Sequence, residues 1–182
     1  MNSWFFAALA AVGGVVLWYI MTMNRVARLL VKIREAGSGI EVALTRRFDT
    51  LTKMLDVTRA YARHEADTLG NIVKMRQGMS MTQRSDADRQ MDVLRGKINV
   101  LAEAYPELRS SENFRVLQTS IADIEEEIQA VRRIYNMNVS QFNQLLVTWP
   151  DSIVGRLQGH KKEDFFKAEE EKKQDVAMQF SL

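Results

Sequence analysis

The sequence FRVLQTSIADIEEEIQAVRRIYNMNVSQFNQLLVTW, residues 114–149, repeats an apolar or aromatic residue at alternating steps of three and four. This spacing places the repeated positions on one face of a helix. A helix of this length, roughly 55 Å, is too long to bury that face in a compact globule, so it favours an elongated antiparallel bundle. The repeated positions are Phe114, Leu117, Ile121, Ile124, Ile128, Val131, Tyr135, Asn138, Phe142, Leu145 and Trp149.

Asparagine interrupts the apolar pattern near the end of this stretch. In a strict heptad register Asn138 takes a core position, but a straight helix drifts by about 20° per heptad. The drift is expected to move Asn138 to the border of the apolar face and to bring Val139 and Leu146 onto it. Asn136 and Asn143, seven residues apart, fall on the opposite border.

Two interpretations of these three amides are open. In the first, the amides bond across to a neighbouring helix and determine which helices pack together, at some cost in stability. In the second, they line a polar pocket for a ligand together with Tyr135 and His64. We predict the first and keep the second as its alternative.

Two further helical stretches precede this one. Residues 40–80 predict one long amphipathic helix, and the more polar residues 77–85 predict a break, with Ser85 as the N-cap of the next helix. The next helix ends before Pro106, because proline disfavours helix in the residue preceding it. The charged side chains of the first stretch are expected on its other faces; they are Arg46, Arg47, Lys53, Asp56, Arg59 and Arg63.

The composition is that of an all-α protein. Only two prolines and nine glycines occur in 182 residues rich in good helix formers. The 25 basic and 23 acidic side chains leave a net charge of +2, which provides no general field for nucleic acid. The absence of cysteine excludes disulfides and a cysteine nucleophile.

A run without any charged residue lies near the N-terminus: WFFAALAAVGGVVLWYIMTM, residues 4–23. At 1.5 Å per residue the run measures about 30 Å, the thickness of the hydrocarbon core of a bilayer. Aromatic residues lie near both ends, as rings that prefer the headgroup boundary do. A cleaved signal peptide is the alternative, but no basic side chain precedes this run, which is long for a signal. We predict a transmembrane anchor over residues 1–24.

A basic segment follows the anchor. Its cations are Arg25, Arg28, Lys32 and Arg34. Basic residues favour the cytoplasmic side, so the N-terminus is expected outside and the rest of the chain in the cytoplasm. The cations either set this topology alone or also hold the segment near anionic lipid headgroups. Gly37 and Gly39 disfavour helix, so residues 25–39 are predicted to form a basic neck with a kink or short hinge.

No motif in the sequence indicates a reaction. No glutamate stands three residues before His64 or His160, so the Glu-x-x-His pattern of di-metal bundles is absent. The zinc-protease pattern begun by His64 fails at Thr68, and no nucleophile elbow, P-loop or dinucleotide motif occurs. Residues 125–127, three glutamates, are expected on a solvated outward face. We predict no catalytic residue, no cofactor and no metal site.

The C-terminal part combines a short apolar segment with a charged tail. Blocks of charge alternate across residues 161–182, which predicts a mainly solvated tail, disordered beyond about residue 170 unless a partner orders it. A short helix before the tail is expected to dock on the bundle through apolar side chains. These side chains are Ile153, Val154, Leu157, Phe165 and Phe166.

Three runs give the chain a specific resemblance. They are TRRFDTLTKMLDVTRAYARHE (residues 45–65), LAEAYPELRSSENFRVLQ (residues 101–118) and IYNMNVSQFNQLLVTWP (residues 134–150). With the anchor and the FFKAEE segment, they make the sequence similar to the LemA family of bacterial single-pass membrane proteins. The resemblance implies a bundle of long helices over residues 40–160 and a role in membrane organisation or stress. It implies no catalytic residue.

These observations lead to two hypotheses of function. The first is a non-catalytic structural or adaptor protein of the bacterial inner membrane, which self-associates or recruits other membrane proteins at the cytoplasmic face. It would contact the lipid bilayer and not nucleic acid. The second is a ligand- or metal-sensing bundle, or an enzyme, with its pocket at the amides Asn136, Asn138 and Asn143.

Overall fold

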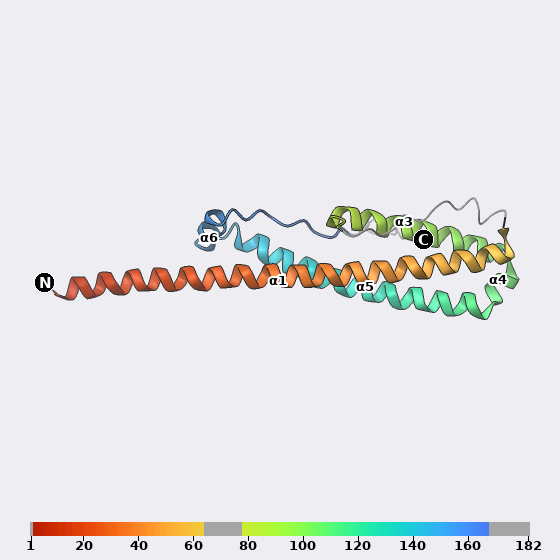
Figure 1. Cartoon of the computed structure of the whole chain (residues 1–182), viewed down its shortest axis with the longest axis horizontal. Coiled ribbons are helices and arrows are strands. Elements are labelled where there is room, and N and C mark those ends of the chain that lie inside the picture. Colours follow the sequence, from red (N-terminus) through yellow and green to blue (C-terminus); the bar gives the residue numbers. More distant parts are fainter. Residues whose placement is uncertain (1, 64–77, 168–182) are drawn as a thin grey trace, which may run out of the picture. The chain divides into compact units, whose positions relative to one another are not determined.

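The computed structural model describes residues 2–63 and 78–167, and the secondary structure in these ranges is helical, without a strand. The predicted all-α class is therefore confirmed. Figure 1 shows the order of the helices along the chain. They are α1 (Asn2–Tyr61), α3 (Met81–Ala104), α4 (Pro106–Ser110), α5 (Glu112–Leu145) and α6 (Asp151–Leu157).

The chain divides into two compact units, and both α1 and α5 contribute to each. The described part of the first unit comprises residues 2–41 and 128–165. The described part of the second unit comprises residues 42–63, 78–127 and 166–167.

In the first unit, α1 and α5 run antiparallel. Gly39 faces Val131, and the carbonyl of Lys32 accepts a hydrogen bond from Asn138 at 3.4 Å. Lower numbers on α1 thus meet higher numbers on α5, and Figure 1 shows α5 and then α6 along the same stretch of α1. The core of this unit includes Val26, Leu29, Ile33, Ile40, Ile128, Tyr135, Val139, Phe142, Leu145 and Val154.

The hinge predicted at Gly37 and Gly39 is wrong, because α1 continues through both residues without a break. Gly39 lies within the helical contact with α5, where an added Cβ would meet a methyl of Val131 at 3.5 Å, an ordinary contact distance. The intrinsic cost of glycine in a helix is about 1 kcal/mol. The buried side chains on either side, Ile33 and Ile40, outweigh this cost by packing the helix.

The short helix expected after Pro150 is present as α6, but of its three predicted docking side chains only Val154 is buried, whereas Ile153 and Leu157 are exposed. It approaches α5 closely at Gly155, where an added Cβ would lie 2.5 Å from the Leu146 side chain. The helix ends at Leu157, and Gly159, two residues further on, has a φ of 68°. The Gly159 N–H donates to the Arg156 carbonyl and the His160 N–H to the Gly155 carbonyl, both at 3.1 Å. This pair of bonds is a Schellman motif, which requires the left-handed conformation that glycine adopts without strain.

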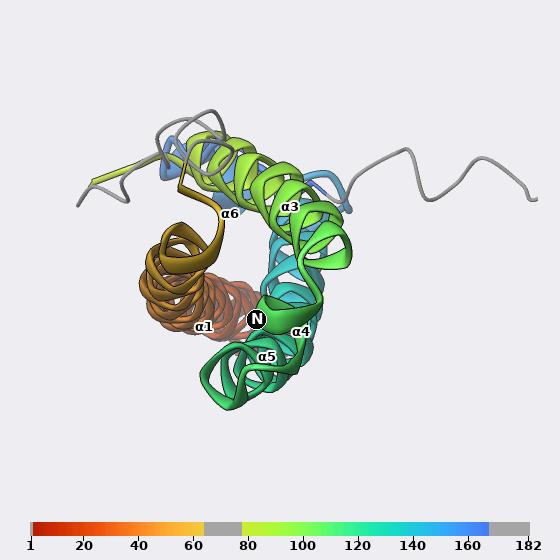
Figure 2. The ribbon, with the colours of Figure 1, turned by 90° about the vertical axis from the view of Figure 1, so that its right-hand side faces the viewer.

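In the second unit, α3 and α5 run antiparallel to each other. Arg95 pairs with Glu125 at 2.5 Å, while Gln118 donates to Asn99 at 3.5 Å. Pro106 begins α4, which connects the two helices (Figure 2). As predicted, α3 ends before Pro106. The buried apolar side chains of this unit include Leu51, Met54, Met91, Ile98, Leu108, Phe114 and Ile121.

Two predicted helix boundaries differ from the structure. α1 ends at Tyr61, short of the predicted residue 80, and residues 64–77 lie outside the described part of the chain. The N-cap of α3 is Ser80 and not Ser85. The Ser80 hydroxyl accepts from the Gln83 N–H at 3.2 Å, and the Gln83 side chain accepts from the Ser80 N–H at 2.8 Å. This reciprocal pair satisfies two exposed donors, which a cap at Ser85 would not do.

The apolar face of α5 follows the predicted series with two corrections. The predicted drift does bury Val139, but Asn138 stays in the interior, with 5% exposure, and does not move to the border. Val139 and Asn138 can both be buried because α5 packs against more than one neighbour in the first unit. Trp149 lies beyond the end of α5 and is 79% exposed, so it does not belong to the buried face.

Candidate functional site

The four predicted neck cations, Arg25, Arg28, Lys32 and Arg34, lie exposed on α1. One of them takes part in a cluster around Asp151, the first residue of α6. Asp151 accepts from the indole N–H of Trp18 at 3.3 Å and from the hydroxyl of Thr22 at 3.1 Å. Arg25 completes the cluster at 3.5 Å. Donors at successive turns of α1 thus hold the start of α6.

On the N-terminal side of this cluster, α1 makes no packing contacts that bury it. Every residue from 3 to 17 is exposed, and only 6% of the most apolar 18-residue stretch of the helix is buried. Among the described helices, α1 is the one long and apolar enough to cross a membrane. A core helix of a soluble protein would bury such a segment.

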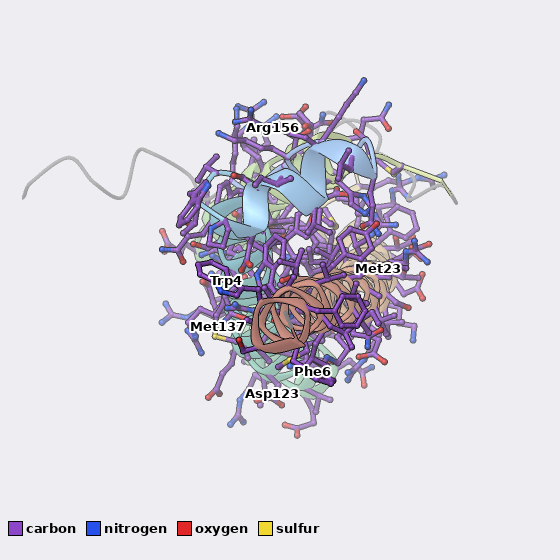
Figure 3. The ribbon with its side chains drawn as sticks, turned by 90° about the vertical axis from the view of Figure 1, so that its left-hand side faces the viewer. Trp4, Phe6, Met23, Asp123, Met137 and Arg156 are labelled. Carbon is purple, nitrogen blue, oxygen red and sulfur yellow. The ribbon has the colours of Figure 1, made fainter. Side chains whose placement is uncertain are left out.

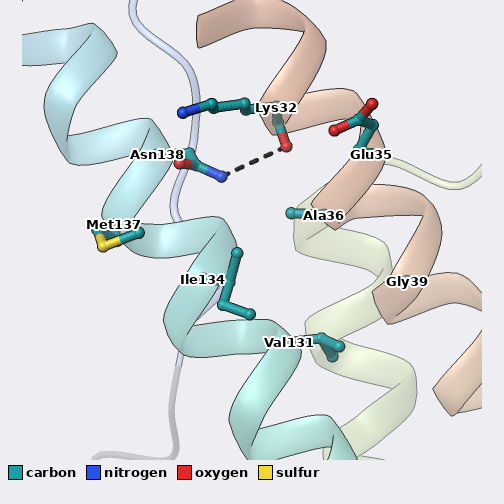
Figure 4. A pocket seen from close by; sticks show the side chains of 8 residues that line it. All are labelled: Lys32, Glu35, Ala36, Gly39, Val131, Ile134, Met137 and Asn138. Carbon is teal, nitrogen blue, oxygen red and sulfur yellow. Dashed lines mark hydrogen bonds between the residues drawn. The ribbon is translucent and has the colours of Figure 1, made fainter.

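Asn138 borders a groove of about 370 Å³ between α1 and α5 in the first unit (Figure 4). Its amide donates to the backbone carbonyl of Lys32, so this amide does bond across to a neighbouring helix. The remaining lining is mainly apolar, with charge only from Lys32 and Glu35. The other lining residues are Ala36, Gly39, Val131, Ile134 and Met137.

Asn143 bonds to an extended segment and not to a helix. Its amide donates to the Glu163 carbonyl and its oxygen accepts from the Glu163 N–H, both at 2.9 Å. The Tyr135 hydroxyl donates to the next carbonyl, that of Asp164, at 3.0 Å. The side chains of α5 therefore bind the backbone of residues 163–164 as a neighbouring strand would. Phe166, which follows, is buried, while Phe165 is 46% exposed.

Within the described residues, Tyr135, Asn138 and Asn143 do not line one common pocket, as the alternative would require. Asn138 lies at the groove, whereas Tyr135 and Asn143 contact residues 163–164. Asn136 is half-buried, and His64 lies outside the described residues. Within residues 2–63 and 78–167, no group of three potential metal ligands comes together.

A buried cation in the second unit is the main feature that the sequence prediction missed. Arg47, expected on an outer face, has a side-chain exposure of 3% and binds three carboxylates. It pairs with Asp88 and Asp92 of α3 and, at 3.1 Å, with Glu125 of α5. Glu125 therefore faces the interior and not the predicted outward surface.

The charges of this cluster largely offset one another, since three carboxylates surround two arginines. Burial alone would lower the pKa of Arg47, but the charges of Asp88, Asp92 and Glu125 raise it above the ordinary value. The guanidinium forms charge-assisted hydrogen bonds with all three partners. Arg95 adds a second cation at Glu125 and Asp92. With every carboxylate paired, the cluster joins three helices and presents no free base.

Comparisons with known proteins agree with this architecture. The model of the LemA family matches residues 36–180. Protein LemA of Metamycoplasma hominis is 32% identical over 145 residues, which cover 76% of this chain and 66% of that protein. Magnetosome protein MamQ of Magnetospirillum gryphiswaldense is 25% identical over 71 residues, 39% of this chain and 26% of that protein. Magnetosome protein MamQ 2 of Paramagnetospirillum magneticum is 27% identical over the same shares.

The apolar segment of α1 and the packed helices that follow it define a class, the all-α proteins associated with membranes. The chain belongs to the LemA family, because the family model covers most of it. It spans just under two thirds of the length of its LemA relative and about a quarter of the magnetosome relatives.

Proposed function

We propose that this protein is a non-catalytic structural or adaptor protein of the bacterial inner membrane. Residues 4–23 cross the bilayer once, with the N-terminus outside and the packed helices in the cytoplasm. There the protein self-associates or recruits other membrane proteins. The observation that carries the proposal is α1 itself, since one continuous helix is fully exposed and apolar over residues 3–17 and packed from Val26 onward.

The contacts of α1 favour a retained anchor over a cleaved signal peptide. Cleavage after the apolar run would remove Trp18 and Thr22, which both donate to Asp151. Asp151 would then keep only the longer contact with Arg25 at 3.5 Å. A carboxylate that loses donors at a partly buried site destabilises the helix it begins. The retained span keeps all three.

The exposed cations of the neck support the orientation. Four basic side chains follow the run on α1. Basic residues near a span favour the cytoplasmic side. The charged cluster around Arg47 supports a structural role, because its groups bind one another across three helices.

Surface features of the second unit support association with other proteins. Val93 and Val100 are one heptad apart on α3, on one face of the helix, and are 54% and 68% exposed. An exposed apolar pair of this kind can pack against a second copy or another helix.

Cysteine labelling tests the span and its orientation, since the chain contains no cysteine of its own. In intact cells, a membrane-impermeant maleimide is expected to label Ser3→Cys and to leave Ser110→Cys, at an exposed site of α4, unlabelled. Ser110→Cys should react after permeabilisation. The opposite pattern would overturn the orientation, and labelling of both variants in intact cells would overturn the span.

Association requires a separate experiment. The full-length protein is crosslinked in native membranes, and its mass is measured by light scattering in detergent micelles. Crosslinked copies or a reproducible membrane-protein partner are expected. A monomer in detergent that captures no protein in native membranes would contradict the structural or adaptor role while leaving the anchor intact.

The groove beside Asn138 favours a second candidate function, a ligand sensor. Ile134→Trp would fill the groove, and Val116→Trp, at a 54% exposed site elsewhere on α5, is its matched control. A metabolite or metal that raises the melting temperature of the wild type and of Val116→Trp, but not of Ile134→Trp, would support this function. A broad screen without any shift would reject it.

A further inference from the structure

Residues 147–157, which end in α6, expose an unusual amount of apolar surface. Trp149 is 79% exposed and Leu157 is 72% exposed, more than any other large apolar side chain described outside residues 4–23. Val147 and Ile153 add exposures of 59% and 44%. Four large apolar side chains within eleven residues form a patch that water solvates poorly.

The contacts of Asp151 fix the level of this patch along α1. Trp18, Thr22 and Arg25 donate to the two oxygens of one carboxylate, so α6 begins beside the last turns of the apolar run. Figure 1 shows α6 at the point where α1 emerges alone, and Figure 3 shows α6 lying across the direction of α1. If α1 crosses a bilayer, α6 lies along its surface.

The charges around the patch match an anionic membrane surface. Arg156, Lys161 and Lys162 are exposed next to it, and Arg156 points away from α1 in Figure 3. Tryptophan prefers the headgroup region, and basic residues are attracted to anionic lipids. The one acidic residue of α6, Asp151, is bound by three donors and so can approach the low-dielectric boundary.

We propose that residues 147–157 form an interfacial foot, which inserts Val147, Trp149, Ile153 and Leu157 into the headgroup region of the leaflet through which α1 leaves the membrane. This inference depends on the transmembrane span proposed above. The occupant of the foot is the lipid surface and not a second copy, because the patch is continuous with the end of the span. The foot would fix the rotation of the first unit about the axis of α1, which a single span could not do.

The test uses the full-length protein in vesicles, with one environment-sensitive fluorophore attached to a single introduced cysteine. Leu157→Cys reports on the foot and Val12→Cys on the span. Ile134→Cys is the matched control, at a 49% exposed apolar residue of the same unit. It lies level with residues 36–39 of α1, about 24 Å further from the membrane than Asp151. Lipids with a spin label near the headgroup quench probes in the interface, and lipids labelled deep in the acyl chain quench probes in the core.

Shallow spin labels are expected to quench the Leu157 probe about twofold more than the Ile134 probe, and more strongly when the vesicles contain phosphatidylglycerol. The Val12 probe should respond to the deep label. A quenched Val12 probe with an unquenched Leu157 probe would overturn the foot while the span stands. An unquenched Val12 probe would overturn the span and the foot together. A Leu157 probe that is shielded from water, but insensitive to labelled lipid, would show a protein contact and would also overturn the foot.

Discussion

Replacing Arg47 with methionine removes the cation that three carboxylates share, and it keeps a long apolar side chain in the interior. Arg95 still compensates Glu125 at 2.5 Å and lies 4.0 Å from Asp92. Asp88, with a side-chain exposure of 12%, loses its ion pair with Arg47. Breaking a buried ion pair in this way costs roughly 3–5 kcal/mol. Because Arg95 still pairs with Glu125, we expect a loss at the lower end of this range, about 3 kcal/mol.

The neighbouring residue provides a matched control. Arg46 forms a 2.5 Å ion pair with Glu127, but its side chain is 57% exposed. An exposed pair of this kind contributes about 0–1 kcal/mol. Arg46→Met and Arg47→Met thus remove the same group from adjacent positions of one helix, and they differ mainly in burial.

The assay is urea unfolding of the full-length protein in detergent micelles, followed by far-ultraviolet circular dichroism. With a slope of about 2 kcal/mol per M, Arg47→Met should lower the midpoint by about 1.5 M, and Arg46→Met by at most about 0.5 M. Adding Asp88→Leu to Arg47→Met should recover most of the loss, since replacing both partners of a buried ion pair with apolar side chains leaves neither charge buried. Equal midpoints for the two single variants would refute the reasoning.

Three further outcomes follow from the same structure. The pKa of Arg47 is raised, so its contribution to stability is complete below the ordinary arginine pKa and is lost only above the raised value. The difference in urea midpoint between wild type and Arg47→Met should therefore be the same at about pH 7 and about pH 10. A difference that shrinks over this range would contradict the raised pKa. Asn143→Leu removes the acceptor of the Glu163 N–H, so hydrogen exchange of that amide should accelerate about tenfold, whereas the exposed control Gln141→Leu should leave it unchanged. Gly159→Ala forces alanine into a left-handed conformation, so the free energy of unfolding should fall by about 1 kcal/mol. An unchanged urea midpoint would argue against the Schellman motif.

The spacing of the sequence places Arg47 on the buried face of its helix, although its charge favoured an outer face. Arg47 stands three residues after Leu44 and four before Leu51, on the buried face itself. Asp88 likewise stands three residues before Met91 of α3. Opposite charges on the apolar stripes of two helices indicate a buried ion pair, whereas assigning charged residues to outer faces by type hides it.

Other features could not be read from the sequence because they depend on distant partners. The amide of Asn143 was expected to face a helix, yet it binds residues 163–164, twenty residues further along, in an extended conformation. The continuity of α1 through Gly39 depends on packing against Val131, which outweighs local propensity. The all-α class and most of the apolar face of α5 rest on local patterns, and these were predicted correctly.

The buried polar groups act together to fix the register of the helices. An apolar face with a heptad repeat can slide by seven residues and still bury apolar side chains, so its packing alone specifies the register weakly. Sliding α5 by one heptad would bring Arg132 or Gln118 to the level of Arg47 in place of Glu125. Either shift removes an ion pair, and Arg132 would add a like charge. The same shift would leave the Lys32 carbonyl without Asn138, facing Val131 or Leu145. Each of these two slipped registers therefore loses polar contacts in both units, which favours the observed pairing of the long helices.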